Sequence, residues 1–167
     1  NLYGLEATPA ESATFRFARL DRERFSGIRT AGHEGDTPYY TNSTKLPADY
    51  DGTLQGALIN QDSLQPLYTT GTVFHVYMER ELEDWKKARD LLSSMITEHH
   101  IPCFTLSPVY TICQTCGYLP GRQERCPKCN GAADVYSRIA GYYRPVHDWN
   151  DGKAQEFRNR IMFRIGE

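Results

Sequence analysis

The stretch GTVFHVYMERELEDWKKARDLLSSMITEHHIPCFTLSPVY, residues 71–110, decides the fold class. It opens with Thr72 to Met78, a run of β-branched and aromatic residues without a charge, which is typical of a buried strand. Residues 80–100 then carry apolar side chains at intervals of three and four between charged ones, which predicts an amphipathic helix. Pro102 ends this helix, and Phe104 to Tyr110 has the composition of a second strand. Strand, helix and strand in this order predict a parallel βαβ unit with a right-handed crossover, and hence an α/β fold.

Length and composition limit the class of protein. The chain has 167 residues, enough for one domain with a small appendage. Its 19 Lys and Arg against 21 Asp and Glu give a net charge of −2, which argues against direct binding of nucleic acid or of a membrane surface. No apolar run reaches the roughly 18 residues of a membrane span, so we expect a cytoplasmic protein. The chain starts at Asn1 without an initiator methionine, and we expect it to be the C-terminal part of a larger protein.

Downstream of the βαβ unit, four of the five cysteines form two CxxC pairs, Cys113/Cys116 and Cys126/Cys129. Gly117 and Asn130 follow the pairs, where a tight turn needs a left-handed residue. Four thiolates at this spacing predict a closed, structural zinc site. Two disulfides, an iron–sulfur cluster and a nucleic-acid-binding zinc ribbon are the competing interpretations.

Other elements are predicted by local signals. Thr8, Pro9 and Glu11 have the pattern of a capping box and predict a helix to about Leu20. Residues 21–38 are rich in charge and glycine and predict an irregular connection. The remaining expectations are a short strand or turn at 39–44, a short helix at 58–67, an extended segment at 134–143 and a C-terminal helix at 152–162.

After the cysteines comes the run Ser137-Arg138-Ile139-Ala140-Gly141-Tyr142-Tyr143-Arg144-Pro145-Val146. With residues 149–153 and 156–157 behind it, this run resembles the C-terminus of the anaerobic (class III) ribonucleoside-triphosphate reductases, as do the four cysteines. Residues 5–12, 40–43 and 71–75 add further similarity, so that the resemblance spans essentially the whole chain.

The resemblance implies a radical chemistry. Gly141 stores a glycyl radical, which a separate radical S-adenosylmethionine activase with an iron–sulfur cluster generates. The radical passes to a cysteine at the tip of an inner loop of a ten-stranded α/β barrel, and this thiyl takes the 3′ hydrogen of a ribonucleoside triphosphate and initiates loss of the 2′ hydroxyl. The thiyl cysteine lies upstream of this chain in the family, so we expect the chain to be inactive alone. We expect Cys103 to be a buried apolar thiol.

A radical must be kept from oxygen, so we expect the Gly141 loop to be buried in the barrel, and Arg144 needs a partner if it is buried too. The start of the first helix is a further candidate site, because unpaired backbone N–H groups favour phosphate. By the resemblance, the substrate-binding residues are Thr8, Ala10, Glu11, Ser12, Asn42 and Ser43. The alternative is that Thr8 and Glu11 only cap the helix and that residues 41–43 form an ordinary turn. His75, inside an apolar strand, is expected to be a core residue.

The expected architecture is the C-terminal part of a ten-stranded α/β barrel of the glycyl-radical enzyme type (residues 1–110), a four-cysteine zinc-ribbon-like knuckle (111–133), and a glycyl-radical loop with a tail (134–167). The implied partners are the ribonucleoside triphosphate, the activase, formate or a redoxin as reductant, nucleotide effectors on the upstream part and a second copy in a homodimer. An autonomous glycyl-radical spare part and a non-catalytic zinc-ribbon binding module remain as alternatives.

Overall fold

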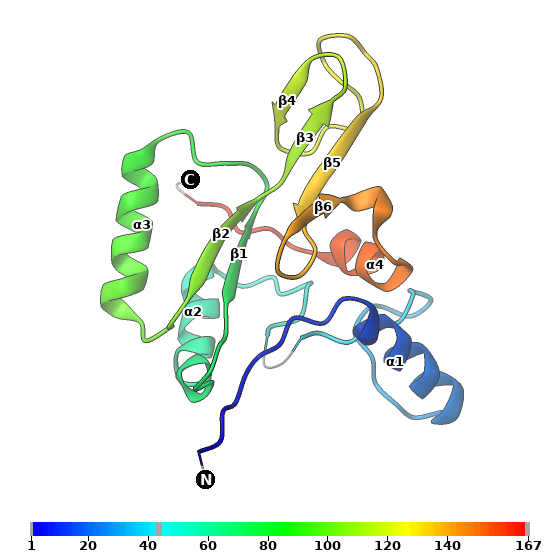
Figure 1. Ribbon diagram of the computed structural model, residues 1–167, viewed down its shortest axis with the longest axis vertical. Helices are drawn as coiled ribbons and strands as arrows, with labels where there is room; N and C mark the ends of the chain where they lie inside the picture. The colour runs from blue at the N-terminus through cyan, green and yellow to red at the C-terminus, as the bar shows by residue number, and fades with distance from the viewer. Residues whose placement is uncertain (1, 43–44, 166–167) are drawn as a thin grey trace.

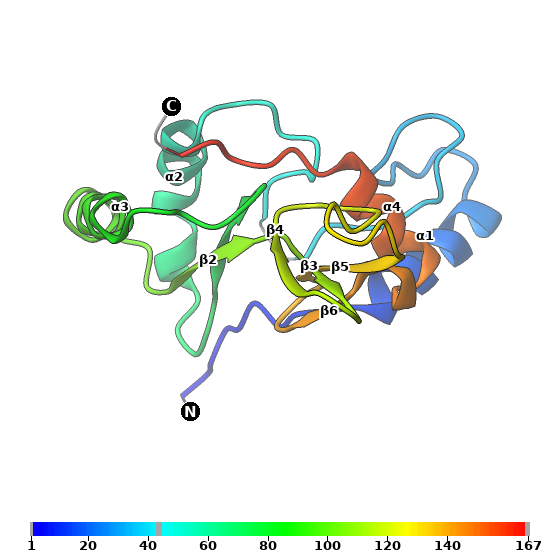
Figure 2. The same cartoon turned by 90° about the horizontal axis from the view of Figure 1, so that it is seen from above.

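The computed structural model describes residues 2–42 and 45–165. Its centre is the predicted βαβ unit, in which β1 (Phe74–Met78) pairs in parallel with β2 (Phe104–Pro108) and Phe74 lies opposite Phe104. The connecting helix α3 (Trp85–Glu98) begins after Asp84, whose side chain accepts a hydrogen bond from the N–H of Lys86. Figures 1 and 2 show α3 lying beside the two strands.

The two faces of β1 have different neighbours, as the alternation of side chains along a strand requires. Val76 and Met78 belong to the main core, which also contains Leu58 of α2 (Leu54–Asp62) and Met95 of α3. A short 3-10 helix, η1 (Gln65–Leu67), follows α2. Arg160 lies over the ring of Tyr77, on the face that carries the candidate site. Tyr77 and His75 line the cavity described below, and Phe74 belongs to the core and also lines that cavity.

A second, antiparallel sheet follows β2 directly, in the order β4-β3-β5-β6. Its strands are β3 (Tyr110–Cys113), β4 (Gly117–Pro120), β5 (Ala133–Arg138) and β6 (Tyr143–Pro145). The β3–β4 hairpin projects from the molecule, whereas the turn between β5 and β6 points back towards β1 (Figure 1). The 3-10 helix η2 (Val146–Asp148) and α4 (Asp151–Asn159) end this part of the chain and share a core with Val109 and Ile139.

The N-terminal helix differs from the prediction at both ends. α1 runs from Ser12 to Arg24, and its capping residue, Glu11, makes no side-chain cap hydrogen bond. The predicted capping box at Thr8 is therefore wrong. Thr8 lies one turn too early, and the Glu11 carboxylate bonds to the Gly141 loop instead. α4 also ends at Asn159, three residues before the predicted end.

The helices of the described segments are all too short or too polar to cross a lipid bilayer. Within the same segments the strands form one two-stranded and one four-stranded sheet. The structure is thus a mixed α/β fold.

Candidate functional site

The four cysteines of the CxxC pairs meet beyond the end of β3. Their sulfur atoms all lie within 4.8 Å of one another, and Cys113 Sγ is 3.6 Å from Cys129 Sγ. A tetrahedral zinc site with Zn–S bonds of about 2.3 Å has S···S edges of roughly 3.8 Å. The four sulfur donors therefore fit a tetrahedral metal ion.

The backbone at the cluster has the predicted turns. Gly117 has φ +78° and Asn130 has φ +58°, so each CxxC pair is followed by a left-handed residue, as expected. The N–H of Asn130 donates to the carbonyl of Cys126 over 2.8 Å, which closes the second turn. These turns bring each pair of thiols to the same side of its bend.

The thiols do not ionise alike. Backbone N–H groups of Cys129 and Lys128 point at the Cys126 sulfur and lower its pKa to about 6. Hydrogen bonding to the Cys129 sulfur, together with burial, raises the pKa of Cys116 to about 12. Four adjacent thiolates repel one another, so full ionisation of the cluster needs a cation at its centre.

Gly141 lies in the tight turn between β5 and β6, where the N–H of Ile139 donates to the carbonyl of Tyr142 over 3.0 Å. Its φ is outside the left-handed region, and a Cβ built on it would meet no described atom within 4 Å. Neither backbone conformation nor packing against the described residues requires glycine here. Ordinary structural reasons for a glycine are thus absent from this part of the chain.

The described residues bury only part of the loop. Ile139 and Ala140 are buried, but Gly141 is exposed and Tyr142 is 51% exposed. The residues on either side of the turn fold back onto the chain, whereas its tip has no cover from residues 2–42 and 45–165. No sequence pattern indicated that β5 and β6 would form a hairpin whose tip the described residues leave uncovered.

Three side chains brace the turn. Arg138 Nη1 donates to the carbonyl oxygen of Gly141 over 2.7 Å. The Tyr142 hydroxyl donates to Glu11 Oε2 over 2.9 Å, and Arg144 Nη1 lies 3.5 Å from Glu11 Oε1. Glu11 is thus the partner that Arg144 requires. Sequence spacing could not identify it, because the two residues lie 133 positions apart.

The predicted substrate-binding residues lie along the entry to α1. Thr8 and Ser12 are exposed, and the N–H of Ala10 donates to Asn42 Oδ1 over 3.0 Å. The structure thus brings residues 8–12 together with Asn42, while Ser43 lies outside the described residues. Glu11 faces the glycine turn through its carboxylate.

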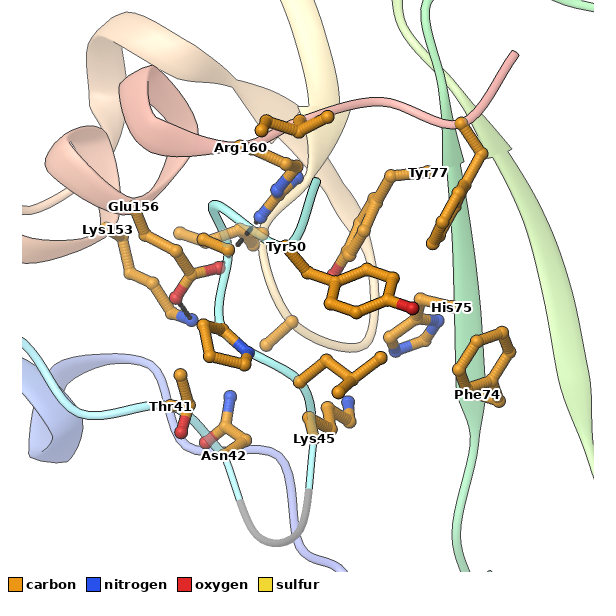
Figure 3. Close-up of a pocket in the computed structure, with 17 residues that line it drawn as sticks. Thr41, Asn42, Lys45, Tyr50, Phe74, His75, Tyr77, Lys153, Glu156 and Arg160 are labelled. Carbon is orange, nitrogen blue, oxygen red and sulfur yellow. Dashed lines mark hydrogen bonds and ion pairs between the residues drawn. The ribbon is translucent and has the colours of Figure 1, made fainter. Parts of the chain in front are cut away.

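A cavity of about 90 Å³ lies between β1, residues 41–42 and 45–50, the residues just before Gly141, and α4. Figure 3 shows Lys45 and His75 on one side of it and Lys153, Glu156 and Arg160 on the other. Lys153 Nζ is 2.6 Å from Glu156 Oε2, and Arg160 Nη2 is 2.8 Å from Glu156 Oε1. Burial alone raises the pKa of Glu156, but the two cations outweigh it and lower the pKa.

This buried ion network was missed by sequence reasoning. Its signal is the spacing of Lys153, Glu156 and Arg160, three and four residues apart, which places them on one helical face. The same spacing occurs on many exposed helices. Only the burial of this face, across the cavity from β1, distinguishes the network from a solvated one.

His75 is a core residue, as predicted. Its ring is 8% exposed, and Nδ1 lies 2.8 Å from Thr105 Oγ1 on the paired strand. Burial and the nearby Lys45 charge lower the pKa of His75 to about 3, so that the ring is neutral at physiological pH. Burial and the Lys153 charge likewise lower the pKa of Lys45 to about 8.

Cys103 corrects another expectation, because its side chain is exposed rather than buried. The residue lies just before β2, and its carbonyl accepts a hydrogen bond from the N–H of Phe74 over 2.8 Å. The backbone pairs with β1 while the thiol stays outside the apolar core.

Comparison with known proteins agrees with these features. The family model described as "Anaerobic ribonucleoside-triphosphate reductase" matches residues 1–163. The relatives of that name from Escherichia coli K12 and from Enterobacteria phage T4 are each 24% identical over 95% of this chain. The chain spans 23% and 27% of their lengths, about a quarter of the relatives it matches.

Solved structures show the same fold. A structure titled "Anaerobic ribonucleotide reductase" superposes with a TM-score of 0.70, at 20% identity, over 96% of this chain and 25% of its own. The Thermotoga maritima anaerobic ribonucleotide reductase with dATP bound in its specificity site gives a TM-score of 0.64, at 21% identity, over 88% of this chain and 23% of its own. The match of the family model to nearly every residue carries the assignment: the chain belongs to the anaerobic ribonucleoside-triphosphate reductase family.

Proposed function

We propose that this chain carries the glycyl-radical and zinc part of an enzyme that reduces ribonucleoside triphosphates to deoxyribonucleoside triphosphates, for DNA precursor synthesis in the cytoplasm without oxygen. The observation that carries the proposal is Gly141. It is a glycine that neither backbone conformation nor packing explains, at the tip of a braced hairpin, in a member of this family.

Glycine suits radical storage for a physical reason. Loss of a hydrogen atom from Cα leaves a centre that must flatten to share its unpaired electron with both neighbouring amides, and a side chain would oppose this. A separate radical S-adenosylmethionine activase with an iron–sulfur cluster is proposed to take this hydrogen atom. The described residues leave the tip of the turn uncovered, so on this proposal its protection from oxygen comes from the upstream part of the enzyme.

We assign zinc to the four-cysteine cluster and give it a structural role. All four positions are filled by sulfur, so the ion would have no open position for water or substrate. Cys113, Leu119 and Cys126 form a core too small to be stable without a cross-link. Bound zinc would supply that cross-link. Strand β5 runs from this segment to the turn that holds Gly141, so the zinc would also hold the start of that strand.

The entry to α1 is proposed to hold the substrate phosphates. Thr8 and Ser12 expose hydroxyl groups there, and the first turn of α1 carries N–H groups that favour an anion. Ala10, Asn42 and Ser43 belong to the same proposal, with Asn42 holding the Ala10 N–H. Glu11 is proposed to act differently, by orienting the glycine turn from the edge of this site.

The proposed division of the chain is a barrel part at 1–110, a zinc part at 111–133 and the radical turn with its tail at 134–167. The rest of the ten-stranded barrel, the thiyl cysteine and the nucleotide effector sites belong to the upstream part of such an enzyme. Formate or a redoxin would supply the electrons, and two copies would form a homodimer. On this proposal residues 1–167 are inactive alone.

Anaerobic activation followed by electron paramagnetic resonance tests the proposal. We expect a doublet from the single α-hydrogen of a radical at Gly141, and its complete loss in Gly141→Ala. Gly27→Ala is the matched control and keeps the doublet, because Gly27 is also exposed, also has a φ outside the left-handed region, and its added Cβ would also meet no described atom within 4 Å. Silence of the wild type with an authentic activase and a complete reductase chain would sink the radical assignment and favour a non-catalytic zinc-ribbon module. Restoration of an oxygen-cleaved reductase by residues 1–167 alone would favour the spare-part alternative.

A further inference from the structure

Arg138 makes a contact with Gly141 that the proposed function does not use. Its Nη1 donates to the Gly141 carbonyl oxygen over 2.7 Å, and its Nε donates to Ser107 Oγ over 3.0 Å. The guanidinium carbon also lies 4.9 Å from the ring centroid of Tyr143. Contacts to β2, to β6 and to the turn fix the planar group in one orientation, which is how arginine gains directionality.

The backbone of Arg138 is held as firmly as its side chain. Arg160 Nη1 donates to the Arg138 carbonyl over 3.2 Å and to Ser137 Oγ over 3.3 Å. Arg160 is in turn paired with the buried carboxylate of Glu156. The Arg138 guanidinium is thus aimed at Gly141 from a fixed backbone, with the buried ion network behind it.

A charged donor at this carbonyl matters for a radical at Cα. The unpaired electron is stabilised when the neighbouring carbonyl withdraws electron density from Cα and the preceding nitrogen donates it. A guanidinium hydrogen bond polarises the carbonyl further, and charge-assisted hydrogen bonds are about twice as strong as neutral ones. The stabilisation grows as spin density reaches the oxygen, so it favours the radical over the parent glycine.

We propose that Arg138 is a positioning residue that orients the Gly141 carbonyl and polarises it as the radical forms. The proposal rests on the proposed function, because it concerns the radical assigned to Gly141. In the activation step, the Gly141 Cα–H bond breaks homolytically and the hydrogen atom joins a carbon radical derived from S-adenosylmethionine. No charge is gained or lost at Gly141, and Arg138 keeps all its protons throughout.

Electron–nuclear double resonance on the activated full gene product tests the proposal, with arginine labelled by ¹⁵N in the guanidinium group. We expect coupling of the radical to a ¹⁵N nucleus and to an exchangeable proton that is lost in D₂O. Arg138→Met should remove the ¹⁵N coupling and widen the α-hydrogen splitting, because more spin remains on Cα. Its doublet should also decay about tenfold faster, the factor that roughly 1.4 kcal/mol produces.

Arg144→Met is the matched control, because Arg144 also lies three residues from Gly141 but points to Glu11. It should keep the ¹⁵N coupling and the wild-type splitting. Arg138→Lys retains the charge without the planar fork and should recover part of the doublet lifetime. Metal content and circular dichroism show whether each variant is folded.

The two possible failures are distinguishable. A wild type without any doublet contradicts the radical assignment itself. A wild-type doublet without ¹⁵N coupling, or one whose splitting and lifetime are unchanged in folded Arg138→Met, overturns the role of Arg138 and leaves the radical assignment intact.

Discussion

The hydroxyl of Tyr142 donates to the carboxylate of Glu11 over 2.9 Å, which ties the residue after Gly141 to the residue before α1. Glu11 also accepts from Asn150 through its backbone carbonyl, over 3.3 Å. One residue thereby joins the entry of α1, the glycine turn and the start of α4. The proposed phosphate site and the proposed radical site consequently share a side chain.

Loss of this tie should loosen the glycine turn without unfolding the protein. Tyr142→Phe removes one exposed hydrogen bond, and Glu11→Gln weakens that bond together with the contact to Arg144, so we expect a loss of only about 0.5 to 1 kcal/mol in unfolding free energy. Amide hydrogen exchange at residues 139–143 should nevertheless become several times faster. Glu98→Gln, which removes a similar carboxylate that accepts from Ser94, is the control. Equal amide exchange rates at residues 139–143 in all variants would contradict a stabilising role of the Tyr142–Glu11 hydrogen bond.

The metal should depend on the clustered cysteines and not on Cys103. Cys126→Ser replaces a sulfur with an oxygen that binds zinc poorly as a neutral ligand, so we expect less than one ion per chain by elemental analysis. Cys103→Ser, at an exposed thiol, should retain one ion per chain. Chelation of the wild type should make residues 113–133 sensitive to protease. A fully loaded Cys126→Ser protein would falsify the four-sulfur site.

Glu156 should be among the most costly single residues to neutralise. Glu156→Gln leaves Lys153 and Arg160 buried, 1% and 8% exposed, without their counter-charge, so we expect a loss of about 3 kcal/mol in unfolding free energy. Glu124→Gln, which breaks an exposed pair with Arg122, should cost less than about 0.5 kcal/mol. Urea denaturation of both variants gives the comparison.

The same carboxylate gives a pH dependence. The pKa of Glu156 is lower in the folded protein than its ordinary value of 4.5. Its contribution to stability is therefore complete above about pH 4.5 and is lost as the pH falls through the folded pKa. In Glu156→Gln this acid loss should be smaller, which denaturation between pH 3 and pH 6 measures.

His75 should make the free energy of unfolding begin to fall at a higher pH than Glu156 does. The unfolded chain takes up a proton at this residue near its ordinary pKa of 6.5, whereas the folded protein does so only at about 3. Stability should therefore decline below pH 6.5, by up to about 1.4 kcal/mol per unit. His75→Gln should flatten this slope. Comparison at pH 8 isolates the lost contact with Thr105 from the titration.

Local patterns predicted those parts of the fold that local forces determine. The strands and helix of residues 71–110 show in their periodicity, because each element buries one face. The left-handed Gly117 and Asn130 follow from the geometry of a CxxC turn. The capping box predicted at Thr8 does not form, because the Glu11 side chain bonds to Tyr142, 131 positions away, instead of capping its own helix.

The candidate site was predictable in its types of residue and not in its contacts. The cysteine spacing contains the metal geometry, so the cluster could be read directly. The support of Gly141 by Arg138, Arg160 and Glu156 depends on how the end of α4 meets β5, which no spacing reveals. For Cys103 the sequence predicted too much: its strand-like neighbourhood indicated a buried thiol, whereas the side chain is exposed.

Strand β5 begins at Ala133, four residues after Cys129, and ends at Arg138, three residues before Gly141. Six residues of strand span about 20 Å. On the proposed function, the metal site and the radical site therefore lie near the two ends of one strand. Cobalt in place of zinc would put a paramagnetic ion at one end of β5, and a radical at Gly141 would put an unpaired electron near the other. The dipolar coupling between the two spins depends on their distance, so it would change if the strand bends when a partner docks.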